Sequence, residues 1–458
     1  MRIAVNHGTS KCRGKYRIHG ALGRVATAPR EETSPSGPKP IRWLPAFLAA
    51  ALVLSTLETR AQDLLRIGTS GDYTPFSVWV EAGKGSPHYA GFGPELARAY
   101  ARDRGLSPRF IAFRWPELMR DLEAGRFDVA MSGITVRPER SLAGRFTSPV
   151  ARSGAVALVP NEAAITSAAD LNAPGVRVSV NAGGHLERTA RKKLPRATII
   201  AVADNRAVMA ALKSGSVEAV ITDTREAPHW QAEMSGLRVV GPFTRDYKAL
   251  WVRSDLPDLA RDLDAWLLAR ELDGQMSAWR AQHLGDAPES ESHRPVLDAL
   301  LAAMAERLAL MPLVAEAKRH AGSPVEVPER EVRVIAAALG QVRETESANG
   351  VEESQRLPAP AVRQFFTAQI EAAKAIQRAV LAEPAPAGEE PPVSLEDSLR
   401  PALLRIGDRI ARLIVRLPPG IPAQVIGPRS EREFSGLGLP QPRIDALARG
   451  IAPLRPEP

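Results

Sequence analysis

Two kinds of hydrophobic pattern divide this chain of 458 residues. Between residues 64 and 284, short apolar runs rich in β-branched residues alternate with stretches whose apolar positions recur every three or four residues. Beyond residue 294 the short runs nearly vanish and the helical spacing continues alone. The first pattern indicates an α/β domain with largely parallel sheets, and the second indicates an all-α domain. A polar linker, residues 285–294, separates them.

The individual elements follow from the same pattern. The predicted strands of the first domain are residues 65–69, 110–113, 129–131, 156–159, 176–180, 198–202, 219–222 and 250–252. Its predicted helices are residues 94–104, 116–124, 205–214 and 256–270. In residues 295–420 a helical period runs through Val296, Leu300, Met304, Leu308, Met311 and Val314, through Val362, Phe366, Ile370, Ala373 and Val380, and through Leu399, Leu403, Ile406, Ile410 and Leu413. Residues 384–392 are predicted to be an inter-helix loop, and 421–458 a Pro/Gly-rich C-terminal extension with one helix near 443–452.

The first 61 residues predict export. Basic residues extend to Arg42, an apolar run covers 43–57, and Thr59-Arg60-Ala61 provides a small-x-small site before Gln62. This order is typical of a secretory signal peptide, whereas the run is too short for a confident membrane span. The basic segment before the run is long, so either the true start lies downstream of Met1 or the segment is a retained anchor. We predict cleavage near 61/62 and a periplasmic protein.

Charge and cysteine content narrow the function classes. The net charge of +8 suggests nucleic-acid binding, but residues 1–61 hold ten Lys and Arg against three Asp and Glu, a net of +7. Only +1 is left for residues 62–458, which argues against a nucleic-acid partner. Cys12 is the one cysteine and lies in the leader, so the mature chain has no disulfide and depends on its cores alone.

The stretch 125–140, GRFDVAMSGITVRPER, carries candidate chemistry. It is predicted to be a short strand, 129–131, followed by a Ser-Gly-Ile-Thr turn that leads to Arg137 and Arg140. Backbone N–H groups, small hydroxyls and a bidentate guanidinium at one place suit a small carboxylate. The alternative is a surface loop with solvated arginines.

Residues 64–284 resemble the type II periplasmic amino-acid binding proteins, which have two α/β lobes about a hinge. The resemblance is carried by 71–76 (GDYTPF), 91–96, 127–130 (FDVA), 135–149 and 219–223 (AVITD). It implies that Arg140 binds the α-carboxylate of a ligand, that Thr135 and the backbone near Ser132 share its polar end, and that Asp223 faces an α-ammonium.

A narrower resemblance is to cyclohexadienyl dehydratase, an enzyme built on this receptor fold. It rests on 69–76, on 115–121 with 125–134, and on 181–187 (NAGGHLE). It implies that Glu187 is the general acid, with a pKa raised by a poorly hydrated cleft. The alternative for Glu187 is a helix-start residue that favours the helix dipole. Arg137 is either a second carboxylate clamp or a surface cation, and Trp115 either walls the cleft or packs in the core.

Cations on predicted helix faces mark the second domain. Arg307 and Lys318 are eleven residues apart, about three helical turns, so they share one face, with Pro312 as a predicted kink between them. Together with 306–308, 330–331, 365–377 and 399–401 they resemble the exported gamma class of AroQ-type chorismate mutases. The resemblance implies that the carboxylates of chorismate bind to Arg307, Arg330 and Arg400, and that Lys318 and Gln377 bracket its ether oxygen.

The two resemblances describe consecutive reactions. We expect an exported bifunctional enzyme that converts chorismate to prephenate and then prephenate to phenylpyruvate, or arogenate to phenylalanine. The alternative is an amino-acid receptor of a transporter fused to an active mutase. No metal or organic cofactor is implied, no membrane span is expected after cleavage, and a homodimer through the mutase domain is possible.

Overall fold

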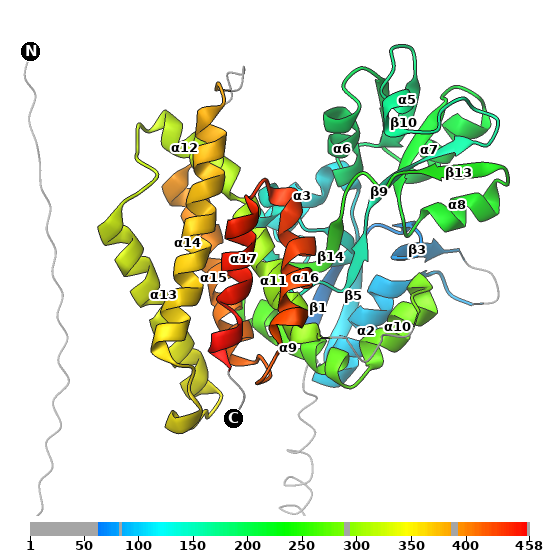
Figure 1. The fold of residues 1–458 in the computed structure, drawn as a ribbon. Coiled ribbons are helices and arrows are strands. Elements are labelled where there is room, and N and C mark those ends of the chain that lie inside the picture. Colours follow the sequence, from blue (N-terminus) through cyan, green and yellow to red (C-terminus); the bar gives the residue numbers. More distant parts are fainter. Residues whose placement is uncertain (1–62, 82–84, 288–293, 386–392, 456–458) are drawn as a thin grey trace, which may run out of the picture. The chain divides into compact units, whose positions relative to one another are not determined.

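The computed structural model describes residues 63–81, 85–287, 294–385 and 393–455. The predicted signal peptide, the middle of the linker and most of the proline-rich loop lie outside the described residues. Residues 62–458 form one compact unit, coloured from blue in its first strands, through green in the second lobe, to red in its last helices (Figure 1). Within the described ranges, no helix combines the length and hydrophobicity that crossing a membrane requires.

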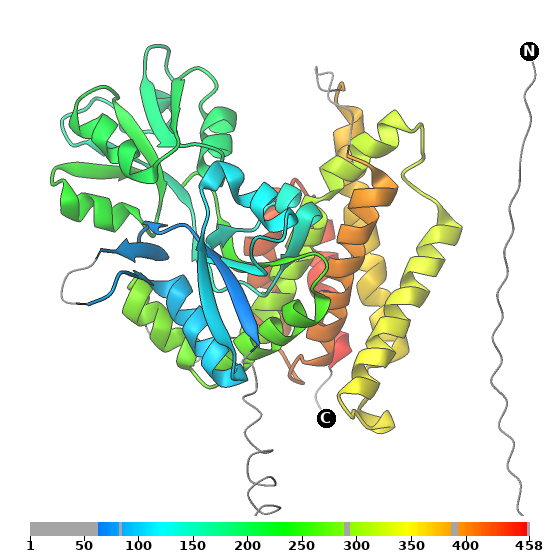
Figure 2. The ribbon, with the colours of Figure 1, turned by 180° about the vertical axis from the view of Figure 1, so that it is seen from behind.

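The first lobe is built on a six-stranded mixed sheet, which Figure 2 shows from behind. β1 (Leu64–Thr69) lies parallel to β5 (Ser107–Ala112) and β6 (Val129–Thr135). β14 (Asp246–Arg253) runs antiparallel to β6 and also pairs with β7 (Gly144–Phe146) and β8 (Ala151–Ser153). A small separate sheet holds β2 (Asp72–Tyr73), β3 (Ser77–Val80) and β4 (His88–Ala90).

Alternation along β6 decides which helices cover each face. Val129 and Met131 share a core with α2 (Phe92–Arg104), α9 (Pro257–Leu272) and α10 (Gln275–Leu284). Ala130 and Ile134 point to the opposite face and pack with η2 (Trp115–Glu117) and α3 (Leu118–Glu123), which precede α4 (Pro138–Ala143). Successive side chains of a strand face opposite sides, so this one strand anchors both layers of the lobe.

The second lobe has a five-stranded sheet in the order β11 (Thr198–Val202), β10 (Arg177–Asn181), β12 (Ala219–Asp223), β9 (Ala155–Pro160) and β13 (Leu237–Val240). One face packs with α6 (His185–Lys193), and the other with α7 (Asn205–Lys213) and α8 (Ala227–Glu233); α5 (Ala168–Leu171) is short. β9 and β13 run antiparallel to their neighbours. The prediction of largely parallel sheets is therefore wrong, because β9 runs against the other strands of this lobe and β14 runs against β6 in the first.

The predicted Ser-Gly-Ile-Thr turn after residue 131 is part of β6. Ile134 and Thr135 pair with Ala249 and Lys248 of β14, which gives the backbone ladder partners that a turn would lack. The register of this pairing shifts between Ala249 and Trp251, opposite Gly133. Gly133 has φ +68°, and a Cβ there would lie 2.5 Å from the Phe76 ring, so the bulge depends on glycine.

The helical part shares one hydrophobic core. Its helices are α11 (Pro295–Ala309), α12 (Met311–His320), α13 (Pro328–Ala348), α14 (Ala359–Ala382), α15 (Arg400–Val415), α16 (Ala423–Phe434) and α17 (Gln441–Arg449), with the short turns η3 (Glu353–Gln355), η4 (Leu395–Leu399), η5 (Ser435–Leu437) and η6 (Ala452–Leu454). Ile426, Phe434 and Leu447 are buried in this core. The described part of the C-terminal extension thus contains two helices that pack into the bundle, where one was predicted.

Pro312 has the predicted effect. The helix that carries Arg307 ends at Ala309, and a new helix begins at Met311, with Leu310 between them. Proline at the second position of a helix lacks only an N–H group that would have no helical partner there. Arg307 and Lys318 therefore lie on two helices, and the straight three-turn spacing between them does not apply.

Buried polar contacts join the bundle to the first lobe. Glu306 of α11 pairs with Arg409 of α15 and accepts a hydrogen bond from Ser141 Oγ of α4 at 2.8 Å. Arg405 donates to the backbone carbonyls of Ser141 and Leu142 at 3.0 and 2.8 Å. A buried charge pair is tolerated when its remaining hydrogen-bonding groups are satisfied, as they largely are for Glu306.

Candidate active sites

A pocket opens between the two lobes, as the sequence predicts. The first lobe contributes strand ends and α4, and the second contributes the first turns of α6 and α7 and the turn before α8. It is lined by Tyr73, Trp115, Gly133, Thr135, Arg140, Asn181, Gly184, His185, Leu186, Asn205, Glu226 and Lys248.

Arg140 is the buried cation on the first-lobe side. Its side chain is 2% exposed, and Nη1 donates to the Thr135 carbonyl at 3.0 Å. Nε has no hydrogen-bond partner among the described residues. Burial and the neighbouring Arg137 lower the pKa of Arg140 well below its ordinary value. A guanidinium with an unmet donor inside a pocket is suited to binding a carboxylate, and this role of Arg140 stays a prediction.

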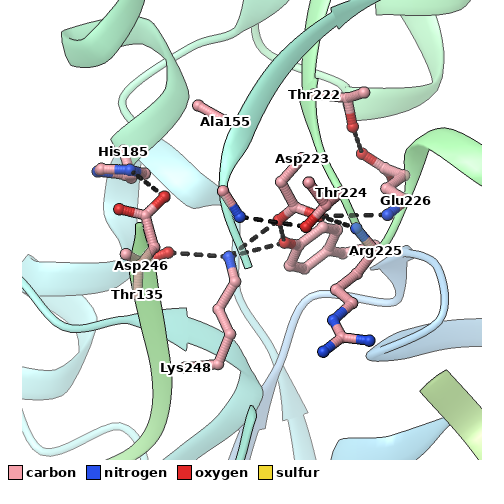
Figure 3. Close-up of polar contacts among 12 residues, drawn as sticks. Thr135, Ala155, His185, Thr222, Asp223, Thr224, Arg225, Glu226, Asp246 and Lys248 are labelled. Atoms are coloured by element: carbon pink, nitrogen blue, oxygen red, sulfur yellow. Dashed lines mark hydrogen bonds and ion pairs between the residues drawn. The ribbon is translucent and has the colours of Figure 1, made fainter. Parts of the chain in front are cut away.

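Lys248 faces Asp223 across the pocket, an arrangement that the sequence analysis missed (Figure 3). The ammonium lies 3.1 Å from the Asp223 carboxylate and donates to Tyr73 Oη at 2.8 Å and to Thr135 Oγ1 at 2.9 Å. Tyr73 in turn donates to Asp223. Although burial acts in the opposite direction, Lys248 and these hydrogen bonds lower the pKa of Asp223. Lys248 thus takes the place beside Asp223 that the resemblance assigned to a ligand ammonium.

Glu226 is the second residue that the sequence analysis missed. Its side chain is 1% exposed and lines the pocket, where it accepts hydrogen bonds from Asn205 Nδ2 and Thr222 Oγ1, each at 2.7 Å. Burial, and next the negative charge of Asp223, raise the pKa of Glu226 well above its ordinary value, against the effect of these hydrogen bonds. Glu226 is therefore a buried carboxyl group at the pocket wall whose protonated form is favoured relative to that of an exposed glutamate. Its position three residues after Asp223 was the available sequence signal.

Glu187 is placed differently. Its carboxylate accepts hydrogen bonds from Gly183 N at 2.7 Å and from Arg191 Nη2 at 2.7 Å, and it does not belong to the pocket lining. Burial acts to raise the pKa of Glu187, but Gly183, Arg191 and Arg188 together outweigh it, and the pKa is lowered. This geometry matches the helix-start alternative more closely than a protonated acid.

Of the other predicted residues of the first domain, one lines the pocket and two lie outside its lining. Trp115 lines the pocket, and its Nε1 donates to Asp72 Oδ1 at 3.1 Å. Ser132 is fully buried and its hydroxyl contacts Ser70 instead of the pocket. Arg137 lines a different cavity, bordered by the helical bundle.

Three predicted cations of the bundle come together from three helices. Burial, followed by repulsion from Arg330 and Arg400, lowers the pKa of Lys318. Burial, followed by repulsion from Arg330, lowers that of Arg400. Lys318 Nζ donates to the Val325 carbonyl at 2.9 Å, and Arg400 pairs with Glu396. Mutually repelling cations at one place favour a polyanionic ligand.

Arg307 and Gln377 complete the predicted set on the α11 and α14 side. Burial lowers the pKa of Arg307 to about 10. Gln377 Nε2 contacts Met311 Sδ at 3.5 Å and donates to the Ala373 carbonyl at 3.2 Å. Arg307 Nη1 and Gln377 Oε1 are buried without partners among the described residues. These two atoms are therefore available to a ligand or to water.

No group of His, Cys, Asp and Glu in the described ranges has the arrangement of a metal site. The pocket between the lobes offers carboxyl, amide, hydroxyl and cationic side chains.

Comparison with known proteins agrees with this division of the chain. Residues 65–286 match the profile of bacterial extracellular solute-binding proteins, family 3. Cyclohexadienyl dehydratase of Pseudomonas aeruginosa is 32% identical over 252 residues, which are 52% of this chain and 92% of that protein. The chain belongs to the family 3 solute-binding proteins. Residues 298–378 match the profile of chorismate mutase type II, so the two resemblances inferred from sequence are confirmed.

Other family 3 proteins match the same half of the chain. The L-cystine-binding protein TcyJ of Escherichia coli is 26% identical over 232 residues, 50% of this chain and 85% of that protein. Among solved structures, an ancestral amino acid-binding protein described as a precursor of cyclohexadienyl dehydratase is 32% identical, with a TM-score of 0.45, and the match covers 48% of this chain and 95% of that one.

Proposed function

We propose that the chain is a bifunctional enzyme in which the bundle converts chorismate to prephenate and the two-lobed domain converts prephenate to phenylpyruvate. The observation that carries the proposal is a buried carboxyl group, Glu226, with a raised pKa in the same pocket as Arg140 and Lys248. A receptor needs ligand-binding groups only, whereas loss of a hydroxyl needs a proton donor.

The first step is a rearrangement without proton transfer. The ether C–O bond of chorismate breaks while a C–C bond forms, so the protein must confine the substrate and stabilise negative charge on the ether oxygen. Arg307, Arg330 and Arg400 bind the two carboxylates, and Lys318 with Gln377 donates to the ether oxygen. The unmet donors and the clustered cations support this assignment.

In the second step Glu226 gives its proton to the ring hydroxyl of prephenate, and the C–O bond breaks to release water. The electrons of the bond to the ring carboxylate complete the aromatic ring, and carbon dioxide leaves. Glu226 is left as a carboxylate and takes a proton from solvent before the next turnover. Arg140 binds one carboxylate of the substrate through its unmet donor. Lys248, whose ammonium already contacts Asp223, Tyr73 and Thr135, adds positive charge to the same pocket.

The pairing of Lys248 with Asp223 favours prephenate over arogenate. An amino-acid substrate would bring an ammonium to Asp223, which is already neutralised by Lys248 at 3.1 Å. Desolvation of a ligand ammonium that finds no free carboxylate is costly. We therefore infer prephenate as the preferred substrate.

Glu187 stays a second candidate for the general acid. Its role requires that substrate binding separate it from Arg191 and raise its pKa. Glu226 needs no such change, and for this reason we favour it.

Export through a signal peptide in residues 1–61 and a periplasmic location are part of the proposal. They are supported by the membership of residues 65–286 in an extracellular solute-binding family. Association of the bundle into a homodimer stays a prediction.

The test is to give the purified protein chorismate alone and to follow chorismate, prephenate and phenylpyruvate. Formation of phenylpyruvate supports both activities. Accumulation of prephenate as the end product would make the two-lobed domain a receptor fused to an active mutase, and stoichiometric retention of an amino acid would then identify its ligand.

A further inference from the structure

A second cavity lies between the bundle and the two-lobed domain, distinct from the pocket that holds Glu226. Its walls come from Val136 to Pro138 before α4, from Pro242 to Tyr247 around the start of β14, from one face of α11, and from the end of α16 with η5. The apolar part includes Phe243, Ala302, Ala305 and Leu437. Tyr247, which donates to Glu433 of α16, connects the two sides.

Arg137 is the buried cation of this cavity. Its side chain is 6% exposed, and Nε and Nη1 have no hydrogen-bond partner among the described residues. The closest carboxylate with which it pairs, Glu139, is 3.9 Å away and forms a shorter contact of 2.9 Å with Arg188. A buried guanidinium with two unmet donors and a shared, distant counter-ion is costly unless an anion completes it.

The acidic residues of the cavity wall are already engaged. Asp246 contacts His185 at 2.8 Å and Thr244 at 2.6 Å. Glu306 pairs with Arg409, and Glu433 accepts from Tyr247. Additional cations on the wall are Lys193, Arg245 and Arg432. The charge offered to a ligand is therefore positive at one end, while the alanines of α11 and Phe243 offer an apolar surface.

The cavity also adjoins residues of both proposed active sites in sequence. Thr135 and Lys248 of the pocket between the lobes are two residues from Arg137 and one residue from Tyr247. Arg307 of the bundle directly follows Glu306, which lines the cavity. A ligand in the cavity thus contacts the backbone segments that position both sets of substrate-binding side chains.

We propose that this cavity is a third binding site, for a small carboxylate with an apolar ring, and that Arg137 binds its carboxylate. Two sources have this chemistry: the intermediate passing from the bundle to the pocket between the lobes, or an aromatic product that acts as an effector. The first source rests on the proposed function, whereas binding itself does not.

Binding is tested by calorimetric titration of the full protein with phenylpyruvate, which neither proposed reaction consumes. Two variants alter the cavity by different means: Ala305→Phe places an aromatic ring in it, and Arg137→Gln removes its cation. Ala269→Phe makes the same change at an exposed alanine of α9 and is the matched control. Each cavity variant is expected to bind one phenylpyruvate fewer than the wild type and the control, with the thermal unfolding of each variant checked separately.

An unchanged number of sites in both Ala305→Phe and Arg137→Gln would overturn the proposal. If Arg137 instead lies in the substrate clamp, Arg137→Gln alone would change binding and Ala305→Phe would not, which also overturns it. A lack of prephenate turnover would refute the proposed function and leave this titration interpretable.

The two sources are separated by kinetics. If the ligand is an intermediate in transit, wild-type protein given labelled chorismate and a tenfold excess of unlabelled prephenate should still form labelled phenylpyruvate. In Ala305→Phe the labelled fraction of the phenylpyruvate should fall to half of the wild-type value or less. For an effector, added phenylpyruvate changes the initial mutase rate at least twofold in the wild type and leaves Ala305→Phe unaffected. Absence of both effects, together with an unchanged number of sites, rejects the site.

Discussion

Substitution of Glu226 by Gln separates acid catalysis from binding. Glutamine keeps the shape of the side chain and can still accept from Asn205, while the Thr222 hydroxyl can rotate to accept from the new amide. The substitution removes the transferable proton only. It also removes the titration of a buried carboxyl, so we expect little loss of stability near pH 7.

The expected loss of rate follows from the role of a general acid. A positioned acid contributes roughly 10²- to 10⁴-fold to the rate, so kcat for prephenate should fall by about this factor. This equals about 2.7 to 5.4 kcal/mol of activation free energy. KM should change little, because Glu226→Gln leaves Arg140 in place to bind the substrate carboxylate.

The pH profile gives an independent readout. The raised pKa of Glu226 keeps the acid protonated above its ordinary range, so dehydratase activity should fall as pH rises through that pKa. The folded state binds this proton more tightly than the unfolded state does. The contribution of Glu226 to stability is therefore full below the ordinary glutamate pKa and is lost as pH rises through the raised one, and Glu226→Gln should remove this dependence.

Glu187→Gln is the matched comparison, assayed in the same way by phenylpyruvate formation. It breaks the ion pair with Arg191, and dehydratase kcat should stay within about threefold of the wild-type value, since partly exposed ion pairs contribute little to stability. Both variants should retain mutase activity. A 100-fold loss in Glu187→Gln with near-normal activity in Glu226→Gln would refute the assignment and return the acid to Glu187.

Three further substitutions test the remaining roles. Lys318→Ala should lower mutase kcat by about 10²- to 10³-fold and spare the dehydratase, and a wild-type mutase rate would mean that another cation stabilises the ether oxygen. Arg140→Ala should cost about 2 to 5 kcal/mol in prephenate kcat/KM, chiefly through KM, and an unchanged KM would move the carboxylate site elsewhere. Lys248→Met leaves Asp223 buried without its cation, so it should destabilise the protein by about 3 to 5 kcal/mol. It should also raise kcat/KM for arogenate, relative to kcat/KM for prephenate, at least tenfold. An unchanged ratio would contradict the proposed preference.

Local patterns were sufficient for most elements but not for the direction of the strands. The apolar runs predicted the cores of eight strands but missed β2, β3, β4, β7, β8 and β13. The predicted strand at 129–131 extends to Thr135 because β14, more than a hundred residues later, supplies its ladder partners. The same distant pairing makes the sheets mixed. Likewise, Pro312 predicted a break in the helix that begins at Pro295, whereas the burial of Phe434 in the bundle depends on contacts that no local period reveals.

The site residues show the same limit. Arg140 was predictable because a guanidinium after a small hydroxyl turn has a recognisable spacing. Glu226 and Lys248 were not predictable, because their chemistry comes from burial and from their contacts with Asp223. Burial and Asp223 raise the pKa of Glu226, and Lys248 neutralises Asp223. Glu187 had the better sequence motif, but Arg191, one helical turn later, pairs with it.

The second lobe is a continuous insertion in the first. The chain enters it at β9 and leaves at β13, and these strands are antiparallel neighbours, with Ala157 opposite Val240. The insertion carries Glu226, while Arg140, Lys248 and the contacts to the bundle belong to the rest of the chain. A recombination event with both ends at this strand pair would replace the acid-bearing module in one step, so a receptor and a dehydratase can share the same clamp and the same fused mutase.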